Sequence, residues 1–204
     1  MALDTYANLK LAIADYLDNA DLVSQVDDFI DLAEARHKRE VRIREMLDRQ
    51  ALTVAARYVD LPTGFLEALG IRLLTDPATP LGGALSWDEL TKRRQETTGQ
   101  PAYYAIHEQI EFDRTPDQSY SGEILFYKAV TALSDSNTSN EILAKDPAFY
   151  LFGALAEAAP FIGADERVAL WESKYARALE GWNAASRRAR HPGPLVSRVS
   201  GATP

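Results

Sequence analysis

The sequence predicts an α+β fold that is mainly α-helical. Apolar residues follow helical spacing near both ends of the chain, whereas residues in the middle alternate with a period of two. The segment 191–204 has no periodicity and contains several Pro and Gly residues. We therefore expect a helical bundle built from N-terminal helices in 1–49 and C-terminal helices in 131–190. A small antiparallel β-sheet module with one short helix is inserted at 50–130, and 191–204 forms an extended C-terminal arm.

Two helices are predicted in the N-terminal segment. The first runs from Leu3 to Leu17, where apolar residues recur every three or four positions. The second runs from Asp21 to Leu47, with Ser24 as a candidate N-cap. Its apolar stripe weakens around His37, where charged residues dominate. We expect this half of the helix to extend beyond the core of its own subunit.

After residue 50, apolar residues recur at every second position, which indicates strands. We expect a hairpin or bent strand pair at 51–61. Ser86 and Glu89 match a capping box that opens a short helix ending at Gln95. Further strands are predicted at 69–74, 81–85, 103–107, 109–112 and 123–129, and the last three are expected to pair antiparallel. Sheet-core packing is the favoured interpretation of the aromatic residues in this part of the chain.

The C-terminal helices carry clear start signals. Asn140 is a candidate cap for a short helix, and Pro147 suits the first position of the next one. Gly163 is expected to end that helix, and the last helix then continues to Arg190. Because Trp171 and Tyr175 lie four residues apart on this last helix, we expect both in the core.

Composition limits the class of protein. The chain has 204 residues and a net charge of −8, and it contains no cysteine. Disulfides and thiolate metal sites are therefore excluded, and the negative charge argues against general affinity for nucleic acid. No apolar run approaches the roughly 20 residues that span a bilayer, and the first residues do not resemble a signal peptide. We expect a soluble protein, made in a cytoplasm, with no membrane partner.

The charges are unevenly distributed. Residues 1–34 hold eight acids and one lysine, whereas 36–49 and the C-terminal end are basic. One interpretation is that these charges lie on solvated helix faces and match the helix dipoles. The other is that an acidic patch of one subunit meets a basic patch of the next. The residues predicted for that subunit interface are Asp27, Asp28, Asp31, Arg36, Arg39 and Arg42.

No motif for catalysis or cofactor binding is present. The three histidines, His37, His107 and His191, are not at metal-ligand spacing, and no phosphate-binding loop or nucleophile elbow occurs. Glu108 and Glu111 could mimic the carboxylate pair of a glycosidase, although solvated strand residues are the favoured interpretation. We expect no cofactor, no metal site and no catalytic activity.

Several stretches resemble the head-to-tail adaptor (connector) family of short-tailed double-stranded DNA phages. Residues 1–46 are similar to its two N-terminal helices, with FIDLAEAR followed by REVRIREM. Residues 58–66, YVDLPTGFL, resemble its turn motif. PAYYAI at 101–106 and YLFGALAEAAPF at 150–161 resemble a later strand and helix. Taken in order, these similar stretches extend over nearly the whole chain.

The resemblance implies a structural virion protein at the head-to-tail interface. Such adaptors form a ring, usually of twelve subunits, beneath the portal. The ring extends the DNA channel without binding DNA specifically and presents a platform for tail or nozzle proteins. In related adaptors the C-terminal arm clasps the portal. The candidate portal-binding residues here are Arg187, Arg188, Arg190, Pro192, Leu195, Val196, Arg198 and Val199.

Two other functions compete with this one. A tail-associated cell-wall hydrolase would use paired carboxylates in a pocket that perturbs one of them. A nucleic-acid-binding regulator would need a basic stripe on one folded face, whereas here the basic residues are split between one helix end and the arm.

Overall fold

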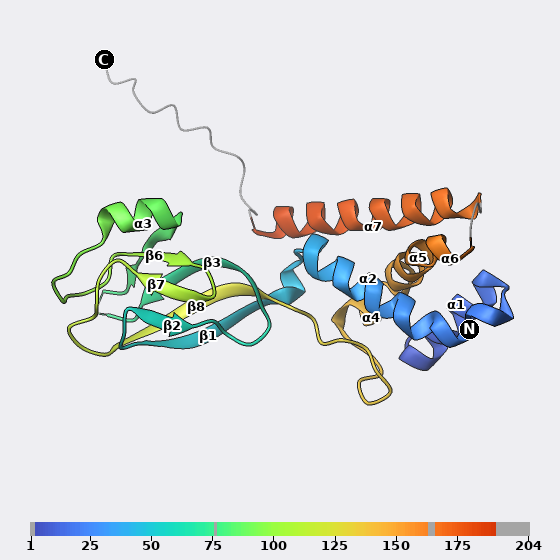
Figure 1. The fold of residues 1–204 in the computed structure, drawn as a ribbon, viewed down its shortest axis with the longest axis horizontal. Helices are drawn as coiled ribbons and strands as arrows, with labels where there is room; N and C mark the ends of the chain where they lie inside the picture. Colours follow the sequence, from blue (N-terminus) through green and yellow to red (C-terminus); the bar gives the residue numbers. More distant parts are fainter. Residues whose placement is uncertain (1–2, 76, 163–165, 191–204) are drawn as a thin grey trace, which may run out of the picture. The chain divides into compact units, whose positions relative to one another are not determined.

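A computed structural model of the chain describes residues 3–75, 77–162 and 166–190, except for the side chains of residues 20, 187 and 190 (Figure 1). These residues divide into two compact units. The first contains the described residues up to Arg44 and those from Ala132 onward, and the second is Glu45–Thr131. Helices build the first unit, whereas two small sheets and one helix build the second. The α+β class predicted from the sequence is confirmed.

The N-terminal helices of the first unit are α1 (Tyr6–Leu17) and α2 (Val26–Glu40), joined by the 3₁₀ helix η1 (Ala20–Gln25). The side chain of Thr5 caps α1 by accepting a hydrogen bond from the Asn8 amide. Asp18 ends α1 in the left-handed region, with φ of 50°.

The helix predicted from Asp21 to Leu47 has incorrect bounds at both ends. It begins with η1, and α2 stops at Glu40 because Val41 adopts an extended backbone, with ψ of 127°. Val41 and Ile43 are β-branched and almost fully buried, at 0% and 1% exposure. Two buried residues at a spacing of two favour an extended chain over another helical turn. A short 3₁₀ helix, η2 (Arg44–Met46), follows.

The C-terminal helices are α4 (Glu141–Lys145), α5 (Pro147–Glu157), α6 (Ala159–Ile162) and α7 (Arg167–Arg190). The predicted cap of α4 is confirmed, since the Asn140 side chain accepts a hydrogen bond from the Leu143 amide at 2.9 Å. Pro147 occupies the first turn of α5, as predicted. Gly163 lies outside the described residues.

Helix α5 lies at the centre of the first unit and contacts α1, α2, α4 and α7. Trp171 and Tyr175 of α7 are buried, as predicted. His37 is buried as well, at 3% exposure, so the expectation that its half of α2 extends beyond the core is wrong. Its ring stacks on Phe149 of α5 at 4.5 Å. Gly153 permits this approach, because a Cβ there would lie 3.3 Å from His37 Nε2.

The second unit contains two four-stranded sheets in place of the single sheet predicted. One sheet has the order β1-β8-β3-β4 and the other β2-β7-β6-β5. The strands are β1 (Leu47–Val54), β2 (Tyr58–Asp60), β3 (Phe65–Leu73), β4 (Thr79–Pro80), β5 (Gly82–Leu85), β6 (Tyr103–Ile106), β7 (Gln109–Phe112) and β8 (Tyr120–Lys128).

Two predicted strand pairings are wrong. Residues 51–61 form no hairpin, because β1 pairs with β8 while β2 pairs with β7 in the other sheet. Likewise, β6 and β7 pair antiparallel as predicted, but β8 joins β1 and β3. Strand β5 also pairs with β6 in parallel, which was not expected. Alternation shows that a segment forms a strand, but pairing depends on contacts between distant segments.

Two further predictions for this unit, the capping box and the packing of the aromatic residues, are confirmed. Helix α3 (Trp87–Arg93) begins with the complete capping box of Ser86 and Glu89. Aromatic side chains from both sheets are buried together with aliphatic ones, so the predicted sheet-core packing is confirmed. The largest of these buried side chains are Tyr104, Phe112, Tyr120 and Phe126.

Candidate interaction surfaces

Arg36 holds α2 against α7 through a bidentate ion pair. Its two terminal nitrogens lie 3.0 Å from the two carboxylate oxygens of Glu172. The Nε atom donates to Glu40 at 3.2 Å, and the guanidinium lies 4.1 Å from the ring centroid of Tyr175. The hydrogen bond to Glu172 raises the pKa of Arg36 above its ordinary value. The charge of this predicted interface residue is therefore compensated within its own subunit.

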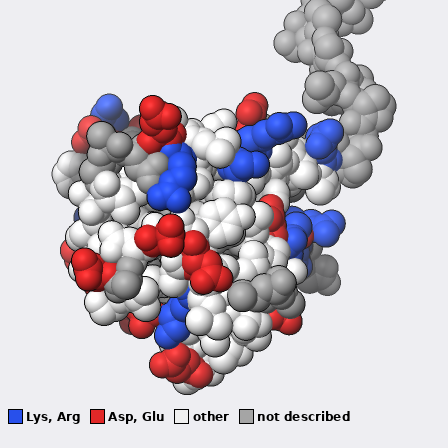
Figure 2. Space-filling model, turned by 90° about the vertical axis from the view of Figure 1, so that its right-hand side faces the viewer, with Lys and Arg blue, Asp and Glu red and all other residues white. Residues whose placement is uncertain are grey.

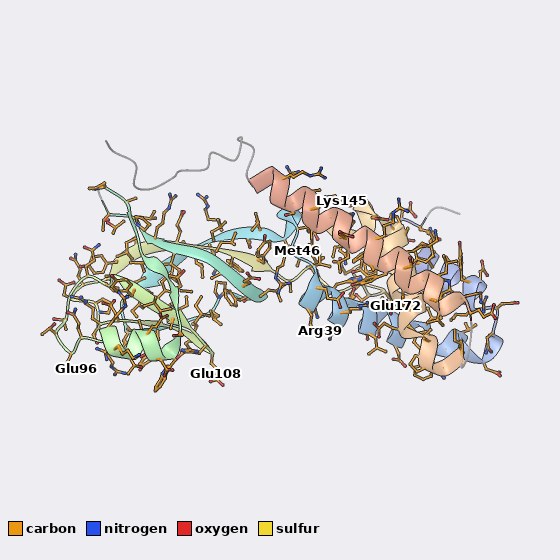
Figure 3. All side chains as sticks on the ribbon, turned by 90° about the horizontal axis from the view of Figure 1, so that it is seen from above. Arg39, Met46, Glu96, Glu108, Lys145 and Glu172 are labelled. Carbon is orange, nitrogen blue, oxygen red and sulfur yellow. The ribbon has the colours of Figure 1, made fainter. Side chains whose placement is uncertain are left out.

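The other two predicted basic residues have different surroundings. Arg42 is half-buried and donates hydrogen bonds to the carbonyls of Lys38 and Val41, at 3.0 and 2.7 Å. It thereby stabilises the C-terminal end of α2. Arg39 is exposed near the same end (Figure 3). Of these three arginines, Arg39 is the exposed one, whereas Arg36 and Arg42 are half-buried.

The predicted acidic residues lie near the start of α2. Asp27 pairs with Lys10 of α1 at 3.3 Å and keeps 58% of its side chain exposed. Asp28 and Asp31 are exposed. Figure 2 faces the end of the first unit that holds α1 and shows acidic and basic groups intermingled among uncharged surface. Acids at the start and bases at the end of α2 also match its dipole, so both interpretations of the charge pattern are consistent with the helix.

A buried polar network was not predicted from the sequence. The carboxylate of Glu34 accepts hydrogen bonds from the Leu133 amide at 2.8 Å and from the Tyr150 hydroxyl at 3.0 Å. The Asn140 side chain donates to the same hydroxyl at 2.7 Å. Burial raises the pKa of Glu34 and of Tyr150. A sequence signal existed, since Glu34 continues the apolar i, i+4 row of Val26 and Ile30.

Comparison with known protein families decides the class of protein. The family model described as SU10 adaptor protein matches residues 4–198, which cover most of the first unit and all of the second. The chain belongs to the SU10 adaptor protein family. This is a phage head-to-tail adaptor family, so the chain is a phage adaptor of structural type located in the virion. No curated protein sequence matches it.

The predicted portal-binding residues of the adaptor lie at and beyond the end of α7. Arg188 is exposed on the last turn of the helix. The side chains of Arg187 and Arg190 lie outside the described residues. The same holds for Pro192, Leu195, Val196, Arg198 and Val199.

The carboxylates considered for a hydrolase lie in the second unit of the adaptor. Glu108 is exposed in the turn between β6 and β7, at the periphery of the unit (Figure 3). Glu111 is 8% exposed, accepts a hydrogen bond from the Tyr58 hydroxyl at 3.3 Å and pairs with Arg94 at 3.5 Å. The described residues contain no group of three or more His, Asp or Glu suited to a metal ion. They also include no helix that could span a membrane.

Proposed function

We propose that the adaptor forms a ring that joins the portal to the tail and extends the DNA channel, with twelve subunits in the ring. The family match over residues 4–198 carries this proposal. The partners are a second copy of the chain, the portal protein, and tail or nozzle proteins. In this ring the helices of the first unit act as the bundle that packs against neighbouring subunits.

Charge polarity along α2 supports a head-to-tail arrangement of subunits. The helix carries Asp27 and Asp28 in its first turn and Lys38 and Arg39 in its last turn. Exposed opposite charges on two ends of one element are complementary when copies follow each other around a ring. We assign the contact to Asp28 and Asp31 of one subunit and Arg39 of the next, because Arg36 is already neutralised by Glu172.

The overall charge suits a channel through which DNA passes. A net charge of −8 disfavours tight binding to phosphate groups, since non-specific DNA affinity depends on lysine and arginine contacts. We therefore assign no specific DNA site to the ring. The C-terminal arm at 191–204, with its preceding arginines, is the segment that docks on the portal.

The proposal is tested by electron microscopy of the purified protein with and without its portal. Light scattering of the same samples gives the mass of the assembly. The expected result is a closed ring stacked coaxially on the portal when both proteins are present. A protein that stays monomeric with the portal and co-sediments with none of the virion proteins contradicts it.

A further inference from the structure

Strand β3 has an edge that is only partly covered. On one side it pairs with β8 along its length. On the other side, within the described residues, it pairs with β4 only through Arg72 and Leu73. One more bond, from the Leu81 amide to the Ile71 carbonyl at 3.0 Å, extends this contact. No described strand pairs with this edge before Ile71, and an open strand edge is a template for another strand.

An open groove of about 350 Å³ lies at the point where this coverage stops. It is lined by Leu69, Leu81, Leu125 and Tyr104, and by the backbone at Gly70 and Gly83. The surface is therefore apolar, with main chain accessible at two positions. Leu69 is 39% exposed and lies at a register shift between Ala68 and Gly70. Such a bulge redirects a side chain away from the regular ladder.

The two glycines are not required by the packing of the chain itself. A Cβ added at Gly70 or Gly83 would meet nothing within 4 Å, and neither residue has a positive φ. By contrast, a Cβ at the neighbouring Gly82 would lie 2.6 Å from the Tyr103 ring. Glycine in the middle of a strand destabilises it relative to alanine. Both glycines lie at register shifts, and glycine in a strand marks either such a bulge or a place where another backbone approaches closely. The open space above both positions leaves room for that second backbone.

The charges around the groove indicate the chemistry of the partner. Arg49 and Arg72 lie 3.4 and 2.6 Å from the same carboxylate, that of Glu123. Their side chains remain 58% and 46% exposed, whereas that of Glu123 is 17% exposed. Among the residues that line the groove, two guanidinium groups and one carboxylate leave one excess positive charge, which favours an acidic occupant there.

We propose that the β3 edge between Phe65 and Ile71 binds an extended segment of another protein in which apolar and acidic residues alternate. The segment adds a strand to the sheet by main-chain hydrogen bonds. Its apolar side chains contact Leu69 and Leu81, and its carboxylates face Arg49 and Arg72. The backbone passes over Gly70 and Gly83, where no side chain obstructs it. This binding site lies within the second unit and does not depend on the ring.

Two synthetic ten-residue peptides provide the probe, one alternating Val and Glu and the other alternating Val and Lys. Each is titrated into the isotopically labelled full-length protein, and backbone amide shifts are followed by NMR. The Glu peptide is expected to shift the amides of residues 65–71 and to bind more weakly as salt is added. Shifts of equal size with the Lys peptide, or no shifts at these amides, overturn the proposal.

Two variants separate binding from folding. Gly70→Val and Gly83→Val each fill open space, so both should fold normally and bind the Glu peptide about tenfold more weakly, which corresponds to about 1.4 kcal/mol. Gly181→Ala on α7, where a Cβ also meets nothing within 4 Å, is the matched control and should bind normally. Unchanged binding by both valine variants overturns the proposal. So does a concentration-dependent shift of residues 65–71 without peptide, which assigns the edge to a second copy of the chain.

Discussion

At the scale of single residues, His37 is the most unusual group in the chain. Its imidazole is 3% exposed and lies among the rings of Phe149, Tyr150 and Tyr175. Neither ring nitrogen has a hydrogen-bond partner among the described residues. Burial, together with the charge of Arg36, lowers the pKa of His37 to about 3. The side chain is therefore neutral in the folded protein at every physiological pH.

This burial predicts that acid destabilises the first unit. Between the ordinary pKa of 6.5 and the folded value of about 3, the unfolded chain binds a proton at His37 and the folded chain does not. The free energy of unfolding therefore falls as pH falls through this window, by about 1.4 kcal/mol per pH unit from this group. Urea unfolding at pH values from 7.5 to 4.5 measures the slope.

His37→Leu is the control for this prediction. It removes the titrating group and breaks no hydrogen bond between described residues, so the free energy of unfolding at pH 7.5 should change by less than about 1.5 kcal/mol. Glu34 titrates in both proteins, so its contribution, which has the opposite sign because its pKa is raised, cancels in the difference. Equal slopes in the two proteins mean that His37 is solvated or paired in solution.

At the scale of elements, two N-cap residues, Asn140 and Ser86, differ in burial. Asn140 is 8% exposed, caps α4 and also donates to the Tyr150 hydroxyl, which in turn donates to Glu34. Ser86 caps α3 in an exposed capping box with Glu89. One cap thus belongs to a network joining α2, α4 and α5, whereas the other stabilises a single short helix.

The difference predicts unequal costs of removing the caps. Asn140→Ala should lower the free energy of unfolding by about 2–3 kcal/mol, because it removes a cap and leaves a buried hydroxyl with one partner fewer. Ser86→Ala should cost about 1 kcal/mol or less. Urea unfolding combined with hydrogen exchange assigns each loss to its unit. Similar losses for the two variants show that the buried network adds nothing beyond the cap.

At the scale of the whole molecule, charge exchange tests how subunits meet. Arg39→Glu alone and Asp28→Lys alone should each weaken ring assembly, because each creates a like-charge contact. The two changes in one chain should partly restore assembly, since positions 28 and 39 again pair an acid with a base, whereas Asp31 then faces an acid at position 39. Assembly should also weaken with salt, as exposed charges are screened over about 8–10 Å at physiological ionic strength.

Sedimentation and electron microscopy of the three variants provide the measurement. Thermal unfolding of each monomer controls for folding, and all three should melt near the wild-type temperature because both side chains are exposed. Normal rings from both single variants show that these charges are solvated and take no part in assembly.

The arm gives a second prediction at this scale. Deletion of 191–204 should leave the thermal melt nearly unchanged and abolish docking on the portal, because the segment carries too little apolar surface to support the folded core. Co-sedimentation of the truncated protein with purified portal measures the loss. Virions assembled with a full complement of truncated subunits contradict the assignment of the arm.

Features that depend on neighbouring residues in the chain could be predicted from the sequence. The caps at Ser86 and Asn140 and the proline at the start of α5 were found because each acts within one turn of its own helix. Burial of Trp171 and Tyr175 followed from helical spacing. The family could be inferred for a similar reason, since its sequence stretches occur in order along the chain.

Features that depend on distant residues were decided by tertiary structure alone. The end of α2 is set by the burial of Val41 and Ile43, which no local capping signal marks. Strands β1 and β2 follow each other in sequence yet pair in different sheets. Arg36 pairs with Glu172 of α7 at 3.0 Å, a partner that its neighbours in the sequence do not indicate. The physical reason is common to all three: spacing along a chain reports which face a residue occupies, whereas its partner is selected by packing between segments far apart in sequence.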